Sequence, residues 1–387
     1  MSLSPRFHEP RLQALLPDLA ASAAARDRDG GHAAAEKARL REAGLLNLSI
    51  PRAQGGEQLP WPDLYRAIRR LATVDSALAH VLAFHHLQVI TVLIYGSAAQ
   101  HDAFLIPTRE QGLWWGNAMN PLDKRLIATP VAGGYRLSGI KSFCSGTRGS
   151  DWLTLSAHVE GQPYPLLAVA PTAQARQLDD WNPIGQRQTD SISVQFEDVF
   201  LPDAQVLKRP NQAPTPAQTL RNCFAQLILV NLYAGIAEGA LEAGIRAVRE
   251  SRAWISAGVE QRVDDPFQQN RVGLLDAQLA GAQTAADRAA ELLALAHARG
   301  AALSAEERGE VSVAIARAKV LAHRISLSAS QELFEMTGAR GTGQAEALDR
   351  FWRNARTHTL YEPAADRLRD VGDYFLNGAY PPFSLPV

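Results

Sequence analysis

Residues 349–358 read Asp-Arg-Phe-Trp-Arg-Asn-Ala-Arg-Thr-His, and a glycine-punctuated segment, Thr-Gly-Ala-Arg-Gly-Thr-Gly at 337–343, stands shortly before them. Arg350, Arg353 and Arg356 recur every three residues, which places them near one face of a helix. Removing three cations from water together is unfavourable unless anions meet them. Two interpretations stay open: carboxylate partners at an interface between elements, or a phosphate-bearing cofactor at the rim of a buried active site.

The composition of the chain indicates a globular protein. Of its 387 residues, 46% are hydrophobic and 20% are charged, which are ordinary values for this class. The net charge of −1 gives no electrostatic reason to expect nucleic acid or an anionic membrane as a partner. Two cysteines, Cys144 and Cys223, are too few for a disulfide framework. Because the opening residues also lack the apolar run of a secretory signal, we expect a cytoplasmic protein.

The most apolar stretch, residues 223–245, is predicted to be a buried helix. It contains Gln226, Asn231, Glu238 and Glu242, polar groups that a membrane span tolerates poorly. We therefore expect no membrane partner.

Three regions of different character follow one another along the chain, at residues 1–110, 111–208 and 209–387. The first is rich in alanine, leucine and arginine with helical periodicity. The second holds short β-rich runs separated by glycine and proline, at 134–139, 152–157, 166–170 and 192–196. The third opens with a proline-rich linker and continues in long helical segments, predicted at 219–254, 265–298, 304–337 and 346–369. This order predicts a mainly α, α+β fold with an N-terminal helical domain, a middle β-barrel or sandwich and a C-terminal four-helix bundle.

Common cofactor motifs are missing from the sequence. There is no GxGxxG after a predicted strand, no Walker A loop and no CxxC pair, so no place to bind NAD(P)H is visible. Gly338, Gly341 and Gly343 follow a helix. They are either a C-cap and inter-helix turn or a set of freed backbone amides that cradle a phosphate or a flavin edge.

Histidines and aromatic residues recur in the predicted helix that covers residues 76–86. His80 and Phe84 share one face, at i and i+4, and a lone buried histidine is usually a hydrogen-bonded core residue. A zinc site prefers two histidines at i and i+4 with a third ligand. His80, His85 and His86 lack that spacing, so we expect no metal.

Two further segments carry groups suited to a ring-shaped ligand. Trp114, Trp115 and Asn117 at the first strand either pave a flat aromatic pocket or pack the helix–sheet junction. In the segment 141–146, Lys-Ser-Phe-Cys-Ser-Gly, Ser145 lacks the context of a nucleophile elbow. A hydrogen bond from its hydroxyl to a ring cofactor is the better functional interpretation.

His358, Tyr361 and Glu362 lie at i, i+3 and i+4, directly before Pro363. A histidine beside a phenol or a carboxylate is suited to acid–base chemistry. The alternative is a local hydrogen bond at a helix terminus.

Together these segments resemble the acyl-CoA dehydrogenase superfamily, over nearly the whole chain. The order of domains matches, as do Gly-Gln-Arg-Gln-Thr-Asp-Ser at 185–191 before a strand and Gly-Ala-Arg-Gly at 338–341 before the arginine-rich helix. Within the superfamily, the sequence is most similar to the reduced-flavin-dependent monooxygenase branch of dibenzothiophene, sulfone and sulfinate monooxygenases. That similarity lies in residues 115–118, 141–146, 180–189 and 350–358, the last followed by Val-Gly at 371–372 and Leu-Asn-Gly at 376–378.

The resemblance implies a set of site residues. Those that would line the flavin are Asn117, Phe143, Ser145, Trp181, Arg340 and Gly341. Those that would face the reacting edge of the ring, as catalytic residues, are His80, Ser145, His358 and Tyr361. Those that would line the substrate pocket are Phe84, His85, Trp115 and Glu362. Two positions depart from the dibenzothiophene enzymes, because Phe84 stands where they have a tyrosine and Tyr361 where they have a second histidine.

The activity that the resemblance implies is that of a two-component monooxygenase. FMN would arrive already reduced, as FMNH2, from a separate NAD(P)H:flavin reductase, which accounts for the missing dinucleotide motif. With O2 it would form a C4a-(hydro)peroxyflavin that oxygenates a small organic substrate. An organosulfur compound (a sulfide, sulfone or sulfinate) is preferred because the most similar motifs point there, with an aromatic compound or an amine as alternatives. The resemblance also implies a homotetramer in sulfur metabolism.

Two other interpretations stay open. One is an FAD-dependent acyl-CoA dehydrogenase with Glu362 as its catalytic base, because Glu362 aligns with the base position of many such enzymes; there glycine and threonine follow the glutamate, whereas Pro363 and Ala364 follow it here. The other is a non-catalytic scaffold.

Overall fold

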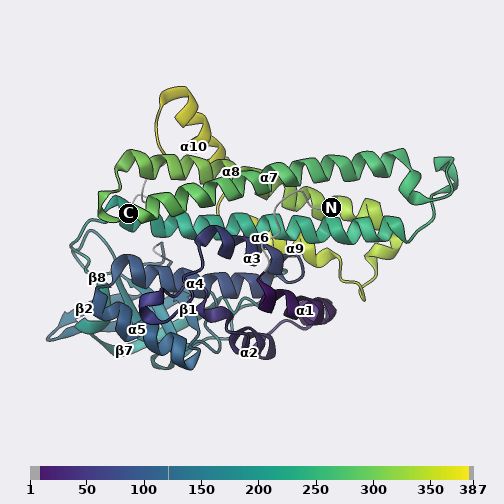
Figure 1. The fold of residues 1–387 in the computed structure, drawn as a ribbon. Coiled ribbons are helices and arrows are strands. Elements are labelled where there is room, and N and C mark those ends of the chain that lie inside the picture. The colour runs from purple at the N-terminus through teal and green to yellow at the C-terminus, as the bar shows by residue number, and fades with distance from the viewer. Residues whose placement is uncertain (1–8, 121, 383–387) are drawn as a thin grey trace.

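The computed structural model describes residues 9–120 and 122–382, and Figure 1 shows their arrangement. Long C-terminal helices run side by side along one side of the molecule, and the strands with their covering helices lie on the other (Figure 1). The N-terminal helices α3 (Trp61–Ala72) and α4 (Ser76–Tyr95) lie between them, since both pack against α6 (Pro216–Arg249) and α4 also packs against strand β1 (Trp115–Ala118). Helix α4 therefore touches both halves.

The N-terminal region is helical, as the sequence predicts. Its remaining helices are α1 (Pro10–Asp29), α2 (Ala34–Glu42) and α5 (Ala98–Gln111), with short 3₁₀ turns at η1 (Leu45–Asn47) and η2 (Arg52–Gln54). Asp75 caps α4 by accepting a hydrogen bond from the Leu78 amide at 2.9 Å. Ser97 and Gln100 form a capping box at the start of α5.

Two four-stranded sheets form the middle region. The first has the order β1–β4–β5–β8 and the second β2–β3–β7–β6. Besides β1, the strands are β2 (Ile127–Val131), β3 (Gly134–Cys144), β4 (Trp152–Ala157), β5 (Leu166–Pro171), β6 (Arg176–Gln177), β7 (Ile192–Pro202) and β8 (Val206–Lys208). The four predicted runs correspond to β3, β4, β5 and β7, whereas β2, β6 and β8 were not predicted.

The C-terminal region holds three long helices, α6, α7 (Pro266–Ala298) and α8 (Ala305–Thr337), and two shorter ones, α9 (Asp349–Thr359) and α10 (Ala364–Asn377). The prediction of one continuous helix over 346–369 is wrong. Leu360 to Pro363 interrupt it, because proline has no amide hydrogen to donate and disfavours helical backbone in the residue before it. The break leaves His358 at the end of α9 and Glu362 in the connection.

Close backbone contact joins the two helical regions. A Cβ atom on Gly235 of α6 would collide with the carbonyl oxygen of Arg69 on α3, and one on Gly239 with that of Thr73. Both α4 and α6 are long and apolar enough to cross a membrane, yet 83% of the apolar window of each is buried inside the protein. They are core helices of this fold. The domain boundaries at 110/111 and 208/209 stay predictions.

Candidate active site

A hydrogen-bonded turn after β3 brings Asn117 and Ser145 together. The backbone amide of Asn117 donates to the carbonyl oxygen of Ser145 at 3.0 Å, which joins the end of β1 to the turn. The Ser145 hydroxyl pairs with that of Ser191 at 2.9 Å, and Ser191 pairs with the hydroxyl of Thr189 at the same distance. Hydrogen bonds in such a chain of three hydroxyls polarise one another. The chain can therefore strengthen a hydrogen bond that Ser145 makes to a ligand.

Phe143, two residues earlier, holds an unusual backbone conformation. Its φ is +59°, and the pairing of β3 with β7 shifts between Lys141 and Cys144. The side chain is 63% exposed and stands edge-on to Trp181, with ring centroids 6.2 Å apart and planes at 84°. A non-glycine residue in the left-handed region stores strain, which is typical of functional sites. Phe143 and Trp181 thus present an aromatic edge beside the Ser145 turn.

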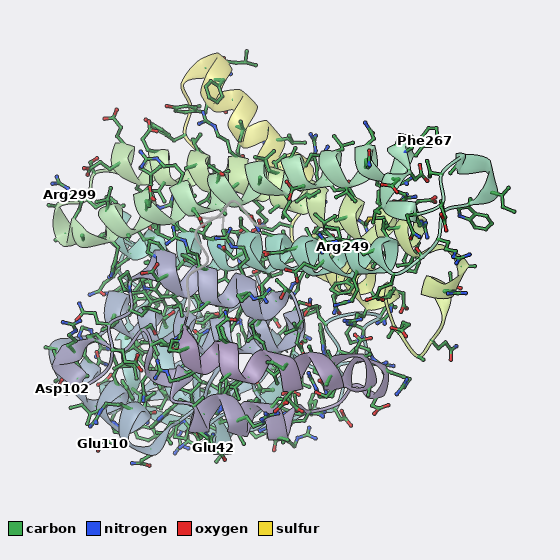
Figure 2. The ribbon with its side chains drawn as sticks, turned by 45° about the vertical axis from the view of Figure 1, so that its right-hand side comes forward. Glu42, Asp102, Glu110, Arg249, Phe267 and Arg299 are labelled. Atoms are coloured by element: carbon green, nitrogen blue, oxygen red, sulfur yellow. The ribbon has the colours of Figure 1, made fainter. Side chains whose placement is uncertain are left out.

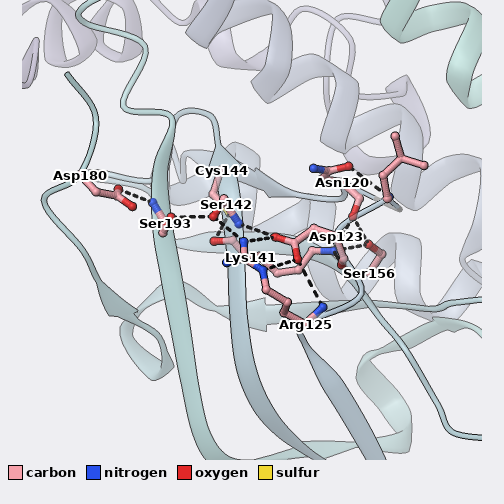
Figure 3. A network of polar contacts seen from close by, with 10 residues as sticks. Asn120, Asp123, Arg125, Lys141, Ser142, Cys144, Ser156, Asp180 and Ser193 are labelled. Atoms are coloured by element: carbon pink, nitrogen blue, oxygen red, sulfur yellow. Dashed lines mark hydrogen bonds and ion pairs between the residues drawn. The ribbon is translucent and has the colours of Figure 1, made fainter. Parts of the chain in front are cut away.

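A buried lysine supports this edge from inside the β region (Figure 3). The Lys141 ammonium donates to the carbonyl oxygens of Asn120 and Asp123, the latter at 2.6 Å, and to the Ser156 hydroxyl at 3.1 Å. Burial lowers the pKa of Lys141 to about 8. These bonds fasten the loop that follows β1 onto β3.

The same network continues toward Trp181. The Asp123 carboxylate accepts from Arg125 at 2.7 Å and from the Ser142 amide at 3.0 Å, and the Arg125 hydrogen bond lowers the pKa of Asp123 to about 2. The Ser142 hydroxyl pairs with Ser193, whose amide donates to Asp180 at 2.8 Å (Figure 3). The residue before Trp181 is therefore tied to the residue before Phe143.

Two buried imidazoles meet between α4 and α9. The His80 ring stacks on Phe84, with centroids 4.0 Å apart, and lies 4.9 Å from the ring of His358. Both His80 nitrogens and the Nδ1 of His358 are buried and have no hydrogen-bond partner among the described residues. Leaving such groups unpaired costs about 1–3 kcal/mol each. An unpaired buried donor or acceptor is therefore a candidate ligand contact.

Burial also fixes the charge of this pair. Desolvation lowers the pKa of His358 to about 3, and desolvation together with the nearby His358 lowers that of His80 well below its usual value. Both rings are neutral at pH 7, so each offers one N–H donor and one acceptor nitrogen. The Tyr233 hydroxyl donates to the carbonyl of His358 at 2.9 Å and holds the end of α9 in place.

The loop 185–191 joins the turn to the histidines. The Gln186 amide donates to the Asn354 side chain on α9 at 2.5 Å, and the Gln186 side chain donates to Ser76 on α4 at 3.0 Å. A Cβ atom on Gly185 would collide with the carbonyl oxygen of Arg353, so only glycine lets the loop lie this close to α9. On the other side, Gly146 packs near Val81, the neighbour of His80.

One of the three arginines in the arginine-rich segment pairs with carboxylates. For this arginine the structure agrees with the first interpretation, that of carboxylate partners at an interface between elements. Arg353 pairs with Asp27 of α1 at 2.6 Å and with Asp349 at 2.7 Å, and donates to the Ile184 carbonyl. Arg350 lies over the Phe351 ring at 4.4 Å and donates to the carbonyls of Glu346 and Ala347. Arg353 thus positions α9, and with it His358, against the N-terminal helices.

Glu362 lies in a closed ion-pair cluster. One carboxylate oxygen accepts from the buried Lys319 of α8 at 2.6 Å, the other accepts from Gln226 at 2.9 Å, and Arg367 lies 3.7 Å away. Both oxygens are occupied by fixed donors, which leaves the carboxylate poorly suited to take a proton from a substrate. Tyr361 beside it is 67% exposed, and its backbone amide donates to the His358 carbonyl at 3.0 Å.

Four expected site residues lie apart from this group within one chain. His85 is fully buried, with Nε2 bonded to the Leu46 carbonyl and Nδ1 accepting from the Trp115 amide. The Trp115 ring is also fully buried, and its N–H donates to Thr108. For both, the expectation of a substrate contact is corrected, because core packing takes up their polar atoms. Arg340 and Gly341 lie on η8 (Gly338–Thr342), where Arg340 is exposed and has no ion pair among residues 9–120 and 122–382.

Arg221 is a residue that the sequence analysis missed. Its guanidinium donates to the Asn117 side-chain oxygen at 3.3 Å and to the Thr91 hydroxyl at 3.1 Å. The signal was present in the sequence, because Arg221 is a lone cation two residues before the most apolar stretch of the chain.

Comparison with known proteins places the chain among described families. Two family models match: the N-terminal domain of acyl-CoA dehydrogenases over residues 15–110 and the C-terminal domain over residues 227–365. The chain is 40% identical over 371 residues to the probable FMNH2-dependent monooxygenase SfnC of Pseudomonas putida, covering 95% of this chain and 94% of that protein. It is 39% identical over 379 residues to dibenzothiophene monooxygenase of Rhodococcus qingshengii, covering 93% and 91%.

Solved structures agree with these sequence matches. Methanesulfinate monooxygenase MsuC of Pseudomonas fluorescens has a TM-score of 0.93 at 40% identity, covering 100% of both chains. FMN-bound TdsC of Paenibacillus sp. A11-2 has a TM-score of 0.92 at 33% identity, covering 97% of this chain and 99% of that one. The chain belongs to the acyl-CoA dehydrogenase family, on the branch that holds dibenzothiophene monooxygenase and methanesulfinate monooxygenase.

Proposed function

We propose that this protein is the oxygenase component of a two-component monooxygenase that uses FMNH2 and O2 to oxygenate a small organosulfur compound. The observation that carries the proposal is the facing pair His80 and His358, three of whose ring nitrogens are buried and have no hydrogen-bond partner in the described part of the chain. A protein that bound nothing here would bury these polar groups without return. The relatives named above support the same activity.

The residues present suit a flavin. Phe143 and Trp181 offer an aromatic edge against which a planar ring system packs, and the strained backbone of Phe143 is what turns that edge outward. Asn117 and Ser145 supply an amide and a hydroxyl for polar atoms of the ring. When bound, the reduced flavin supplies the electrons that activate O2, and the protein supplies orientation and a dry pocket.

The side chains of this protein have distinct tasks in the proposal. Ser145, backed by Ser191 and Thr189, holds a hydrogen bond at the reacting edge of the ring. His80 and His358, both neutral, accept or donate one proton at an unpaired nitrogen without bringing a charge into the pocket. Phe84 covers His80 and keeps water from that side, and Tyr361 lies at the exposed end of the group.

The dehydrogenase alternative loses support from the environment of Glu362. A catalytic base must be free to approach a substrate proton, whereas Lys319 and Gln226 hold both carboxylate oxygens. The sulfur-oxygenating names of the relatives add to this, and FMN is preferred to FAD because one of them is solved with FMN bound.

Several finer points belong to the proposal. The electrons come from a separate NAD(P)H:flavin reductase, and the protein acts in the cytoplasm, away from membranes, in sulfur metabolism. We include a homotetramer because large apolar side chains on α7 stay exposed in one chain, among them Phe267 at 76% (Figure 2) and Leu295 at 65%. Arg340 and Gly341 keep a place at the flavin only if a second copy brings them there.

The experiment is an anaerobic titration of the purified protein with FMNH2 and, separately, FADH2, followed by rapid mixing with oxygenated buffer. We expect tighter binding of FMNH2 and slow reoxidation of the bound flavin, accelerated in Ser145→Ala. If the protein instead purifies with FAD and an acyl-CoA bleaches it, the dehydrogenase is correct. If neither reduced flavin binds, the protein is no flavoenzyme.

A further inference from the structure

One partly buried cation in this region has no anion. Arg221 lies near the start of α6, where its Nε donates to Thr91 and its Nη2 to Asn117, and both acceptors are neutral oxygens. Among residues 9–120 and 122–382, no carboxylate lies within 4.0 Å of its guanidinium. Burial lowers the pKa of Arg221, opposed by Tyr95 and Tyr361, whose side chains lie close enough to act on its charge.

Three other inward-facing arginines of the chain are paired with carboxylates. Arg26 pairs with Asp75, Arg69 with Asp287, and Arg353 with Asp27. Each of these cations leaves water together with a carboxylate, which repays part of the desolvation free energy. Arg221 is desolvated with no such return, although guanidinium stays charged in proteins. An anion that binds there would supply the missing compensation.

The position of Arg221 ties it to the reaction site. It holds the side chain of Asn117, whose backbone amide in turn donates to Ser145. These hydrogen bonds to Thr91 and Asn117 use two of the five N–H groups of the guanidinium. The remaining planar donors match two oxygens of one anionic group, as arginine does with carboxylates and phosphates.

We propose that Arg221 binds the anionic group of the substrate and makes an organic sulfinate, rather than a neutral sulfide or sulfone, the preferred substrate. This rests on the proposed function. The reaction balances as sulfinate plus O2 plus FMNH2 giving sulfonate, FMN and water. One oxygen atom forms a bond to sulfur, which loses two electrons; the flavin loses two more, and the second oxygen atom leaves as water.

The test has a binding arm and a kinetic arm. In the first, calorimetry measures binding of methanesulfonate, an unreactive anion, and of dimethyl sulfone, its neutral counterpart, to the full-length protein without flavin. In the second, KM and kcat are measured for methanesulfinate and dimethyl sulfone with FMNH2 supplied. The proteins are wild type, Arg221→Gln, Arg221→Lys and the control Arg249→Gln, which removes an exposed charge at the other end of α6 (Figure 2).

We expect methanesulfonate to bind the wild type and Arg249→Gln, more weakly Arg221→Lys, and not Arg221→Gln. The KM for methanesulfinate should rise at least tenfold in Arg221→Gln and less in Arg221→Lys, whereas the KM for dimethyl sulfone should rise by a much smaller factor in Arg221→Gln.

Three outcomes would overturn the proposal. Equal losses for both substrates in Arg221→Gln would mean that Arg221 only positions Asn117. Weaker binding of FMN but not of riboflavin would assign Arg221 to the flavin phosphate. Methanesulfonate affinity that is the same in wild type and Arg221→Gln would leave no anion site. The binding arm needs no flavin, so failure of the monooxygenase proposal shows up separately, as missing FMNH2 binding. Thermal unfolding of each variant checks that it folds. If Arg221→Gln does not fold, Arg221→Lys, which keeps the charge, still tests the proposal.

Discussion

Two polar clusters lie at opposite sides of the short connection between α9 and α10, and they differ in one respect. Around Glu362, both carboxylate oxygens accept hydrogen bonds, one from Lys319 and one from Gln226, and Arg367 lies 3.7 Å away. Around His358, three buried ring nitrogens of two histidines have none among the described residues. We interpret the first cluster as one that stabilises the fold and the second as a binding site for a ligand. Titratable residues alone therefore do not mark an active site; what distinguishes this cluster is that two facing histidines both have unsatisfied nitrogens.

The largest effect should come from the unsatisfied cluster. His358→Ala is expected to lower kcat/KM for the sulfur substrate by about 100-fold, the usual size of a lost acid–base contribution. The free energy of unfolding of His358→Ala should fall by much less than the free energy that is equivalent to this loss of kcat/KM. Steady-state kinetics and denaturant unfolding of the same preparation test this. If Lys319→Met lowers activity as much, the contrast between the clusters fails.

The next effect belongs to the satisfied cluster. Lys319→Met leaves the Glu362 carboxylate without its main partner, and we expect the free energy of unfolding to fall by about 2 kcal/mol. The double variant Lys319→Met/Glu362→Gln should recover part of this loss, because no uncompensated charge remains. Urea unfolding of the three proteins measures both changes. A double variant less stable than the single one would contradict the ion-pair interpretation.

Acid should act through the histidines. The pKa of His358 is about 3 in the folded protein and about 6.5 in the unfolded chain. The unfolded chain therefore binds more protons between these values, so the stability is complete above pH 6.5 and is lost as the pH falls toward 3. The expected slope is about 1 kcal/mol per pH unit for this group. His358→Gln should flatten the slope of unfolding free energy against pH; an unchanged slope would show that His358 is not buried neutral.

The smallest effect is a gain. His80→Leu removes two unpaired buried nitrogens, and we expect the free energy of unfolding to rise by about 1 kcal/mol while kcat/KM falls. The matched control is His85→Leu, which breaks two formed hydrogen bonds and should destabilise the protein. Thermal unfolding of both variants measures the two changes. Equal destabilisation would contradict the distinction between His80, as a ligand-binding histidine, and His85, as a structural one.

Much of the fold follows from local sequence signals. The change from helical to strand periodicity near residue 111 and the cap at Asp75 are local, and the structure has both. Strand β2 escaped prediction because Pro130 interrupts its pattern, which an edge strand tolerates and a central strand does not. The helix predicted over 346–369 ignored Pro363.

The site was harder to predict because its character depends on partners distant in sequence. The two carboxylate oxygens of Glu362 accept hydrogen bonds from Gln226, 136 residues away, and from Lys319, 43 residues away. His85 and His80 look alike in sequence, yet the Leu46 carbonyl and the Trp115 amide satisfy only His85. Arg221 needed the structure to bring Asn117 beside it.

The backbone contact between Gly185 and the Arg353 carbonyl has a mechanical consequence. With no side chain between them, the loop 185–191 and helix α9 are in close backbone contact, and we expect them to move together. Thermal motion that carries His358 therefore also carries Ser191, and through it Ser145. We therefore expect the spacing between His358 and Ser145 to stay constant during thermal motion. A side chain at position 185 would push the loop and α9 apart. It would widen that spacing without changing any residue that contacts the substrate.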